Sequence, residues 1–333
     1  MFWKNRRVFV TGADGFIGSH LAERLVGLGA EVTALALYNS FDANGWLDDS
    51  SVAVRESMTV VRGDIRDPHQ MAGLCKGQDV VMHLAALIAI PYSYDAPSSY
   101  VQTNVQGTVN ILQGALRAGV TRVVNTSTSE VYGTAQFTPI NEDHPLQGQS
   151  PYSASKIAAD MMVDSFARSF DLPVVTLRPF NTYGPRQSER AVISTVIRQA
   201  LDPSCGAIRV GELTPTRDFN FVDDTVSAFL AAAQLDGGHT GQAFNAGSGR
   251  MVSIADMVTM VGHITGCDKP VIQEEHRKRP AKSEVMALMA DASRFTAASD
   301  WISSVSLEEG LSKTIEWWKS RLDRVRGDAG YMV

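Results

Sequence analysis

The 333-residue sequence contains few cysteines, and the three present, Cys75, Cys205 and Cys267, lie far apart and form no CxxC pair. This spacing is not that of a disulfide framework, so we expect reduced thiols and a cytoplasmic protein. The sequence also has no run of about 18 apolar residues that could span a membrane. Its N-terminus leads from charged residues directly into a strand-like segment, so we expect no signal peptide.

An excess of positive charge is lacking as well, because the net charge is −6. This argues against nucleic acid or an anionic membrane as the main partner, but a single basic cleft can still hold a phosphate-bearing ligand. Hydrophobic residues make up 44% of the chain and charged residues 20%, as in globular proteins with a sizeable core. The length allows one large domain or two ordinary ones, and we predict no metal site.

The first half of the chain alternates strand-like and helix-like segments. Apolar residues at helical spacing follow the first strand and recur at about 98–118 and 153–170. The strands are apolar on both faces, which is typical of a parallel sheet covered by helices on both sides. After residue 180 the irregular, loop-rich pattern predicts a smaller substrate-covering portion, interleaved with the last sheet elements. The predicted strands lie within residues 6–12, 30–37, 58–67, 78–86, 120–129 and 172–180.

A glycine-rich turn, TGADGFIGSHL, joins the first strand to the first helix. Gly12 permits a tight turn, Gly15 lets the backbone approach a pyrophosphate, and Gly18 lets the helix pack closely on the strand. The helix N-terminus adds free N–H groups and a positive dipole end. The same spacing occurs in ordinary strand–helix turns, but its place in the first βαβ unit favours a dinucleotide site.

The acid that usually ends the second strand of such a site, where it binds the adenosine ribose, is missing. Ala36 and Leu37 stand there, and no arginine replaces the acid to hold a 2′-phosphate. The choice between NAD and NADP therefore stays open. After the third strand, Asp64 and Ile65 are well placed to bracket an adenine, although Asp64 is also a typical turn residue or helix cap.

Tyr152 and Lys156 stand four residues apart in SPYSASKIAAD. Ser150 and Pro151 look like an N-cap and a first helical position, so both side chains share one helix face. An ammonium group and an oxidised nicotinamide both favour phenolate over phenol. Such a tyrosine can take a proton from an alcohol while hydride leaves the same carbon, and Thr128 can share the hydrogen bond. A Tyr-x-x-x-Lys spacing alone also arises by chance.

Five segments occur in the order found in the extended short-chain dehydrogenase/reductases: TGADGFIGS, HLAA at 83–86, TSTSEVYG, YSASK and RPFNTYGPR. The chain resembles the NAD-dependent epimerase/dehydratases of that group over nearly its whole length. The resemblance implies an α/β fold with a doubly wound parallel sheet. It implies a Rossmann domain at 1–180 and a mainly nucleotide-sugar-binding portion at 181–325. It further implies bound NAD, with NADP as the alternative, and a homodimer formed through the helices at 98–118 and 153–170.

The same resemblance implies roles for individual residues. The catalytic positions are Thr128, Glu130, Tyr152 and Lys156, and the last two also contact the cofactor. The other cofactor contacts are Gly12, Gly15, Phe16, Ile17, Gly18, Asp64, Ile65, Leu84, Ala85 and Ala86. The substrate contacts are Ser93, Thr128, Ser129, Glu130, Asn181, Arg186, Arg217 and Arg279. Arginine suits a diphosphate because its planar fork binds two oxygens, although solvation or pairing with Asp218 or Glu284 is the alternative. His83 fits a packed strand-end histidine better than a catalyst, and Trp46 either lines the cleft or anchors its loop.

Glu130 bears on the branch of the family. Related epimerases work through the Thr, Tyr and Lys group alone, whereas 4,6-dehydratases add a carboxylate that removes the C5 proton beside a C4 ketone. Ser129–Glu130 resembles the GDP-mannose dehydratases rather than the Asp-Glu of the dTDP-glucose dehydratases. UDP-glucuronate decarboxylases also carry Thr-Ser-Glu, but they differ around the tyrosine. With one acid of the Asp-Glu pair absent, Glu130 can serve both as C5 base and as proton donor to the leaving C6 oxygen.

Other stretches, among them LYNSFDANGWLDD and LTPTRDFNFV, resemble the 4,6-dehydratases of legionaminic-acid-type pathways, which act on GDP-N-acetylglucosamine. We therefore expect a nucleotide-sugar 4,6-dehydratase, a lyase that acts on a GDP- or UDP-N-acetylglucosamine type of substrate and gives a 4-keto-6-deoxy sugar. The alternatives are a 4-epimerase or UDP-glucuronate decarboxylase of the same family, and a non-catalytic NAD-binding protein.

Overall fold

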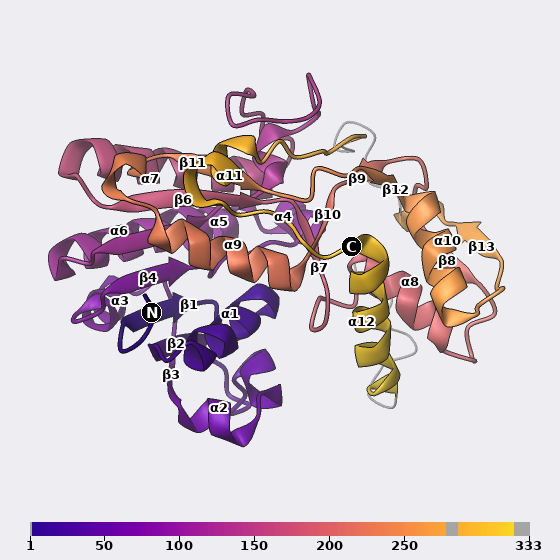
Figure 1. The fold of residues 1–333 in the computed structure, drawn as a ribbon, viewed down its shortest axis with the longest axis horizontal. Coiled ribbons are helices and arrows are strands. Elements are labelled where there is room, and N and C mark those ends of the chain that lie inside the picture. Colours follow the sequence, from indigo (N-terminus) through magenta and orange to yellow (C-terminus); the bar gives the residue numbers. More distant parts are fainter. Residues whose placement is uncertain (1, 278–285, 323–333) are drawn as a thin grey trace.

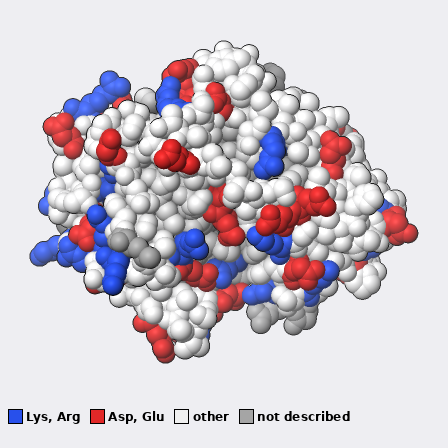
Figure 2. Space-filling view, in the orientation of Figure 1, with Lys and Arg blue, Asp and Glu red and all other residues white. Residues whose placement is uncertain are grey.

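The computed structural model describes residues 2–277 and 286–322. Figure 1 shows a sheet with helices on both of its faces and, beside it, a smaller lobe that contains α8, α10, α12, β8 and β13. Figure 2 shows acidic and basic side chains interspersed on the same view, with neither sign gathered into one continuous patch. Among the described residues, no helix is both long and apolar enough to cross a membrane.

The sheet has seven parallel strands in the order β11-β6-β5-β4-β1-β2-β3. The chain runs outward from β1 to β3 and then crosses to β4 on the other side of β1. The strand order therefore reverses between β1 and β4, where doubly wound sheets bind ligands. The predicted fold class is confirmed, and six strands match the predicted segments. Their bounds are β1 (Arg7–Thr11), β2 (Glu31–Leu37), β3 (Met58–Gly63), β4 (Val80–His83), β5 (Arg122–Thr126) and β6 (Val174–Pro179), and β11 is Ala243–Ala246.

Helices cover both faces of this sheet because its strands alternate their apolar side chains between two cores. Along β1, Val8 and Val10 join the core that packs against α1 and α9, whereas Phe9 joins the core that packs against α6 and α7. The helices of this part are α1 (Phe16–Gly27), α2 (Val52–Glu56), α3 (Pro68–Cys75), α4 (Ile90–Asp95), α5 (Pro97–Tyr100), α6 (Gly107–Ala118), α7 (Pro151–Phe170) and α9 (Val222–Gln234).

Three of these helical segments were predicted from the sequence, and α1 follows the first strand as expected. Helix α7 begins as expected, with Ser150 as N-cap, Pro151 in the first turn, and a reciprocal capping box between Ser150 and Ser153. The segment expected at 98–118 is helical throughout but not regular. It consists of α5, a π-helical segment η2 (Val101–Gln106), and α6. Such π turns are rare and often mark functional sites.

The smaller lobe combines short paired strands with helices, and β11 and α9 return from it to the sheet side. The strands are β7 (Asn181–Tyr183), β8 (Ile208–Val210), β9 (Thr216–Arg217), β10 (Phe219–Phe221), β12 (Val252–Ser253) and β13 (Val271–Gln273). The helices are α8 (Val192–Leu201), α10 (Ile254–Thr265) and α12 (Leu307–Lys319), whereas α11 (Ser293–Ser299) lies beside β11 on the sheet side. Short 3₁₀ turns lie at Gly45–Asp49 (η1), Ser129–Tyr132 (η3), Gly237–His239 (η4) and Glu275–Arg277 (η5).

Candidate active site

The glycine turn between β1 and α1 has a different steric demand at each glycine. Gly12 has φ +66°, and a Cβ there would lie 2.8 Å from the backbone nitrogen of Ala85. A Cβ on Gly18 would lie 2.0 Å from the Gly12 carbonyl oxygen, so α1 crosses the turn in backbone contact. In contrast, a Cβ on Gly15 would meet only the Gly12 oxygen, at 3.3 Å, within 4 Å among the described atoms. The backbone in front of Gly15 is therefore open, as close approach of a pyrophosphate requires.

Helix α1 starts directly at this opening. Gly15 is its N-cap, and within the described chain no side chain caps its first turn. The N–H groups at Phe16 and Ile17, two predicted cofactor contacts, thus begin a helix whose positive dipole end faces the open side of Gly15. The residues present fit the diphosphate of a dinucleotide.

A buried histidine ties the ends of β1 and β4 together beside this turn. The Thr108 hydroxyl donates to the Asn104 carbonyl at 2.6 Å, so it accepts from His83 Nε2 at 3.0 Å. The Thr11 hydroxyl then donates to His83 Nδ1 at 2.8 Å and accepts two backbone N–H groups just after β4. Burial and the nearby Lys156 lower the pKa of His83 to about 3. His83 is therefore a neutral packing residue, as its sequence position suggested, and it fixes the loop that contains Leu84, Ala85 and Ala86.

The end of β3 supplies the predicted adenine contacts. Ile65 is buried, and its carbonyl accepts a hydrogen bond from Asn110 Nδ2 at 2.9 Å. Asp64 does not cap a helix; it pairs with Arg66, and this pairing lowers the pKa of the Asp64 carboxyl. Both residues lie at the carboxyl edge of the sheet, where the sequence placed them.

Tyr152 and Lys156 are both buried on the face of α7 that lies beneath the end of β5. Lys156 Nζ donates to the Thr126 carbonyl at 2.6 Å. Burial lowers the pKa of Lys156 to about 8, and Asp160 partly offsets this effect. Burial raises the pKa of Tyr152, whereas a side-chain hydrogen bond with Thr128 lowers it. The structure thus brings together Tyr152, Lys156 and Thr128, as the sequence predicted.

Glu130 lies on η3, the turn that follows β5. The Thr128 hydroxyl accepts the backbone N–H of Glu130 at 3.2 Å and so caps this turn. The negative charge of Glu130 is one of the influences that raise the pKa of Tyr152. The carboxylate is therefore an electrostatic neighbour of the phenol and not a remote surface acid. Ser129, which stands between Thr128 and Glu130 in the sequence, is buried.

A buried polar network holds this turn from behind. Arg178 on β6 donates to Asp160 Oδ2 at 3.1 Å and to the Tyr132 hydroxyl at 3.0 Å. The Tyr132 hydroxyl donates to Asn245 Oδ1 at 2.7 Å, and Ser127 donates to Asp160 at 2.8 Å. The two ends of the segment 127–132 are thereby anchored to β6, β11 and α7, so the backbone that presents Glu130 is fixed.

Sequence reasoning missed Asn104, which lies in the π-helical segment η2. Its amide exchanges hydrogen bonds with the backbone of Leu87, at 2.8 and 2.9 Å, and donates to Ser155 Oγ at 2.9 Å. Asn104 thus joins the loop after β4 to α7 at Ser155, which lies between Tyr152 and Lys156 in the sequence. Its place in a rare π turn is visible only in the structure, because no spacing in the sequence marks it.

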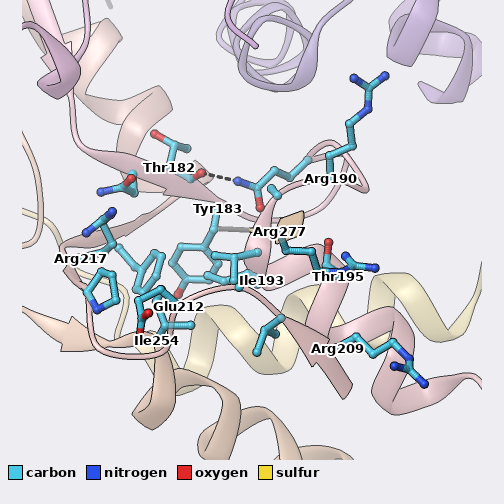
Figure 3. Close-up of a pocket in the computed structure, with 18 residues that line it drawn as sticks. Thr182, Tyr183, Arg190, Ile193, Thr195, Arg209, Glu212, Arg217, Ile254 and Arg277 are labelled. Carbon is cyan, nitrogen blue, oxygen red and sulfur yellow. Dashed lines mark hydrogen bonds between the residues drawn. The ribbon is translucent and has the colours of Figure 1, made fainter. Parts of the chain in front are cut away.

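A cavity of about 290 Å³ opens in the smaller lobe beside this group. Asn181, which lines the cavity, follows β6 as closely as Thr128 follows β5. Because β5 and β6 are neighbouring strands, the cavity and the catalytic group lie at the same edge of the sheet. Figure 3 shows Arg217 and Arg209 on opposite sides of Tyr183 and Ile193. The lining includes Asn181, Thr182, Tyr183, Arg190, Ile193, Thr195, Arg209, Glu212, Arg217, Ile254 and Arg277.

Of the predicted substrate contacts outside the catalytic turn, Asn181 and Arg217 line this cavity. Asp218 is not the partner of Arg217: its carboxylate accepts the backbone N–H groups of residues 248, 249 and 290. Arg190, Arg209 and Arg277 were missed, because a lone arginine in a loop-rich stretch gives no distinctive pattern. Arg209 and Arg277 converge on one carboxylate, that of Glu274.

Two further predicted residues, Arg186 and Ser93, lie elsewhere. Arg186 is buried and pairs with Glu23 on α1 at 2.7 Å. The Ser93 hydroxyl donates to the Ile90 carbonyl of its own helix at 2.6 Å. Arg279 lies outside the described residues.

Trp46 packs edge-on against Trp317 of α12, with ring centroids 5.6 Å apart, so it anchors its loop. Among the described residues, no group of three or more His, Cys, Asp or Glu side chains could hold a metal ion.

Comparison with known proteins gives a consistent family. A family model described as GDP-mannose 4,6 dehydratase matches residues 9–314. The chain is 34% identical over 320 residues to a UDP-glucose 4-epimerase of Mycolicibacterium smegmatis, with 95% of this chain and 99% of the relative covered. It is 33% identical over 315 residues to a dTDP-glucose 4,6-dehydratase of Streptomyces griseus, with 93% of each covered. A UDP-N-acetyl-alpha-D-glucosaminuronate decarboxylase is also similar, at 31% identity. The relatives therefore differ in reaction.

Solved structures agree with the fold. The dTDP-glucose 4,6-dehydratase DesIV of Streptomyces venezuelae, a double mutant with NAD and DAU bound, superposes with a TM-score of 0.85 at 28% identity. The alignment covers 96% of this chain and 98% of that chain.

Proposed function

Since the chain belongs to the NAD-dependent epimerase/dehydratase family of the short-chain dehydrogenase/reductases, we propose that it is a nucleotide-sugar 4,6-dehydratase, a lyase with NAD as its bound cofactor. The proposed substrate is a nucleoside diphosphate hexose of the GDP- or UDP-N-acetylglucosamine type, and the product is a 4-keto-6-deoxy sugar. The residues that would hold NAD are those of the glycine turn, the ends of β3 and β4, and Tyr152 with Lys156.

The bound nicotinamide would supply the acceptor for a hydride from C4 and return it to C6, so the reaction has no net redox change. Tyr152 would act as phenolate, the form that the Lys156 ammonium and an oxidised nicotinamide favour, and take the proton of the C4 hydroxyl; loss of this proton and of the C4 hydride leaves a ketone. The ketone acidifies the proton on C5, and Glu130 removes it. Glu130 then delivers a proton to the C6 hydroxyl, which leaves as water, and C5 regains a proton from solvent. Since Lys156 and Tyr152 are buried, the proton transfer from the C4 hydroxyl to Tyr152 takes place away from bulk water.

The position of Glu130 carries the proposal. A 4-epimerase needs only proton exchange at the C4 oxygen, which Tyr152 can perform. A carboxylate held by the Thr128-capped turn, and close enough to Tyr152 to raise its pKa, provides a second proton acceptor beside the same sugar. Elimination across C5 and C6 requires such an acceptor.

The cavity beside the catalytic turn fits the nucleoside diphosphate. It lies at the adjoining strand end, and Arg190 and Arg217 line it together with Arg209 and Arg277, which pair with Glu274. Guanidinium groups bind phosphate oxygens through paired hydrogen bonds, so this lining suits a diphosphate. Asn181 lies between this cavity and the end of β6, where the sugar would join the nucleotide.

The proposal is tested by incubating the purified enzyme with GDP-N-acetylglucosamine, UDP-N-acetylglucosamine, GDP-mannose and UDP-glucuronate, followed by mass spectrometry. Loss of one water, without net formation of reduced nicotinamide, is the expected result. A product of unchanged mass would identify an epimerase, and loss of carbon dioxide a decarboxylase. Either outcome would overturn the proposed reaction.

The role of Glu130 is tested with Glu130→Gln, which keeps the shape of the side chain and removes the base. We expect water loss to fall by about 10²–10⁴-fold, the usual contribution of a general base. Reduced nicotinamide should accumulate in the variant, because C4 oxidation still proceeds. Asp143→Asn removes one charge from an exposed position in the following loop and should leave the rate unchanged. Full dehydration by Glu130→Gln would show that another group is the base.

We also propose a homodimer formed through α6 and α7. Met161 on α7 is 51% exposed, and Val101, just before α6, is 56% exposed. A Met161→Glu, Val101→Glu double variant should run as a monomer in size-exclusion chromatography with light scattering, whereas the wild type should run as a dimer. A monomeric wild type would contradict this assembly.

A further inference from the structure

The carboxyl end of β2 lacks the acid that ordinarily binds the adenosine ribose in a dinucleotide fold. Its last residue, Leu37, is 58% exposed, and the following Tyr38 is 69% exposed. Neither side chain carries a charged group that could accept hydrogen bonds from the ribose hydroxyls. A ribose at this edge therefore needs a carboxylate from another element.

Asp14 of the glycine turn brings a carboxylate to this place. Its Oδ2 accepts the backbone N–H of Leu37 at 3.1 Å, so the side chain reaches across from the β1–α1 turn to the end of β2. The loop after β2 closes over the same residue. Trp46 N–H donates to the Asp14 carbonyl at 3.0 Å, and Gly45 passes so close that a Cβ there would lie 2.4 Å from that oxygen.

The Asp14 carboxylate has capacity for further donors. Two carboxylate oxygens offer about four acceptor positions. The backbone N–H of Leu37 uses one of them. The remaining positions can accept two neighbouring hydroxyl groups, which is the number that a ribose presents.

The cations at this edge are already paired with other acids. Arg62 lies opposite Ala36 in the β2–β3 register, and its guanidinium donates to the side chain and carbonyl of Asp42 and to Asn44 Oδ1. Arg66 is paired with Asp64. A phosphate on the ribose 2′-oxygen would thus meet the Asp14 carboxylate while both neighbouring guanidinium groups are held by other carboxylates.

We propose that Asp14 takes the place of the missing β2 acid: its carboxylate accepts the hydroxyls of the adenosine ribose and repels a 2′-phosphate, which selects NAD over NADP. The inference rests on the proposal that the glycine turn holds a nicotinamide dinucleotide, but not on the sugar reaction. It assigns the cofactor choice to a residue of the glycine turn.

The test measures binding directly, by isothermal titration of the purified full-length protein with NAD, NADP, ADP-ribose and 2′-phospho-ADP-ribose. We expect the wild type to bind NAD at least 100-fold more tightly than NADP. In Asp14→Asn, which keeps an acceptor for Leu37 N–H, we expect NAD affinity to fall about 10-fold, the usual effect of losing a charge-assisted bond. NADP affinity should rise in the same variant, so that the ratio of the two dissociation constants falls more than 10-fold. The two nicotinamide-free probes should follow the same pattern.

Asp14→Ser is a second variant, which removes the charge and most of the side chain, and its thermal unfolding verifies that the turn still folds. Glu31→Gln is the matched control, because it removes one negative charge from the opposite end of β2 and should leave the ratio unchanged. A ratio within twofold of the wild type in both Asp14 variants would overturn the assignment, as would equal binding of NAD and NADP by the wild type. Dehydration of a sugar nucleotide is not part of the readout, so failure of the proposed reaction remains separate.

Discussion

Lys156 should make the stability of the protein rise with pH, the direction usual for carboxylates and opposite to that of a lysine that gains an acidic partner on folding. It is 4% exposed, and burial lowers its pKa from 10.5 to about 8. Between these two pH values the unfolded chain binds a proton at this lysine and the folded chain does not. The free energy of unfolding therefore rises with pH across this window, and the gain is lost as pH falls toward 8.

The magnitude follows from the two pKa values. Each pH unit of difference corresponds to about 1.4 kcal/mol, so the window from about 8 to 10.5 spans about 3 kcal/mol. This is a large fraction of the stability of a typical domain. Lys156→Met removes the titrating group and keeps a side chain of similar length, so the difference between wild type and variant isolates this contribution.

The assay is urea unfolding of both proteins without added cofactor, at intervals between pH 7.5 and 10.5. The difference in free energy of unfolding should change in favour of the wild type by about 3 kcal/mol as pH rises. Tyr152→Phe provides a contrast on the same helix. Because burial raises the pKa of Tyr152, its contribution is fully present below pH 10, so its difference curve should stay flat up to that pH and turn in the opposite direction only above it.

A constant difference between wild type and Lys156→Met over this pH range would refute the reasoning. It would mean that Lys156 keeps its proton in the folded protein as readily as in water. The hydrogen bond to the Thr126 carbonyl would then outweigh burial, and the protein would hold a full ammonium beside Tyr152 at every working pH.

Three further predictions concern the framework of the site. Arg178→Met should destabilise the protein by about 3–5 kcal/mol because it leaves Asp160 buried without its cation, and adding Asp160→Asn should recover part of this loss in urea unfolding. Gly18→Ala should abolish NAD binding in calorimetry because of the clash with Gly12, whereas Gly27→Ala on the same helix, which meets none of the described atoms within 4 Å, should raise stability by about 0.5–1 kcal/mol. His83→Gln should reduce the loss of stability as pH falls from 6.5 toward 3, because the wild-type histidine must be protonated against a lowered pKa; parallel pH profiles would contradict this.

The sheet could be predicted from the sequence because each of the strands β1 to β6 contains a short apolar run that ends in turn residues. The seventh strand, β11, was missed because its four residues, AFNA, stand in a loop-rich stretch and become a strand only by pairing with β6. The helix expected at 98–118 was correct in extent, but its π-helical interruption was not visible. Composition determines how apolar a helix face is, but it does not show at which turn of the helix an extra residue is inserted.

Contacts that depend on local spacing could be predicted from the sequence, and contacts that depend on distant partners could not. Tyr152 and Lys156 are four positions apart on one helix, so the sequence alone brings them to one face. Arg186 has the composition and context of a phosphate ligand, but it pairs with Glu23, 163 positions away in sequence. Only the crossing of α1 over the loop after β7 decides between these two roles.

The same reasoning explains why the acid at β2 was considered missing. The end of β2 carries Ala36 and Leu37, and the usual acid is defined by that sequence position. The ribose, however, requires a carboxylate at a position in space, and the turn after β1 reaches that position as readily as the end of β2. The hydrogen bond from Leu37 N–H to Asp14 shows that the two elements meet there. Where the end of β2 lacks its acid, a carboxylate of the neighbouring turn can therefore decide between NAD and NADP.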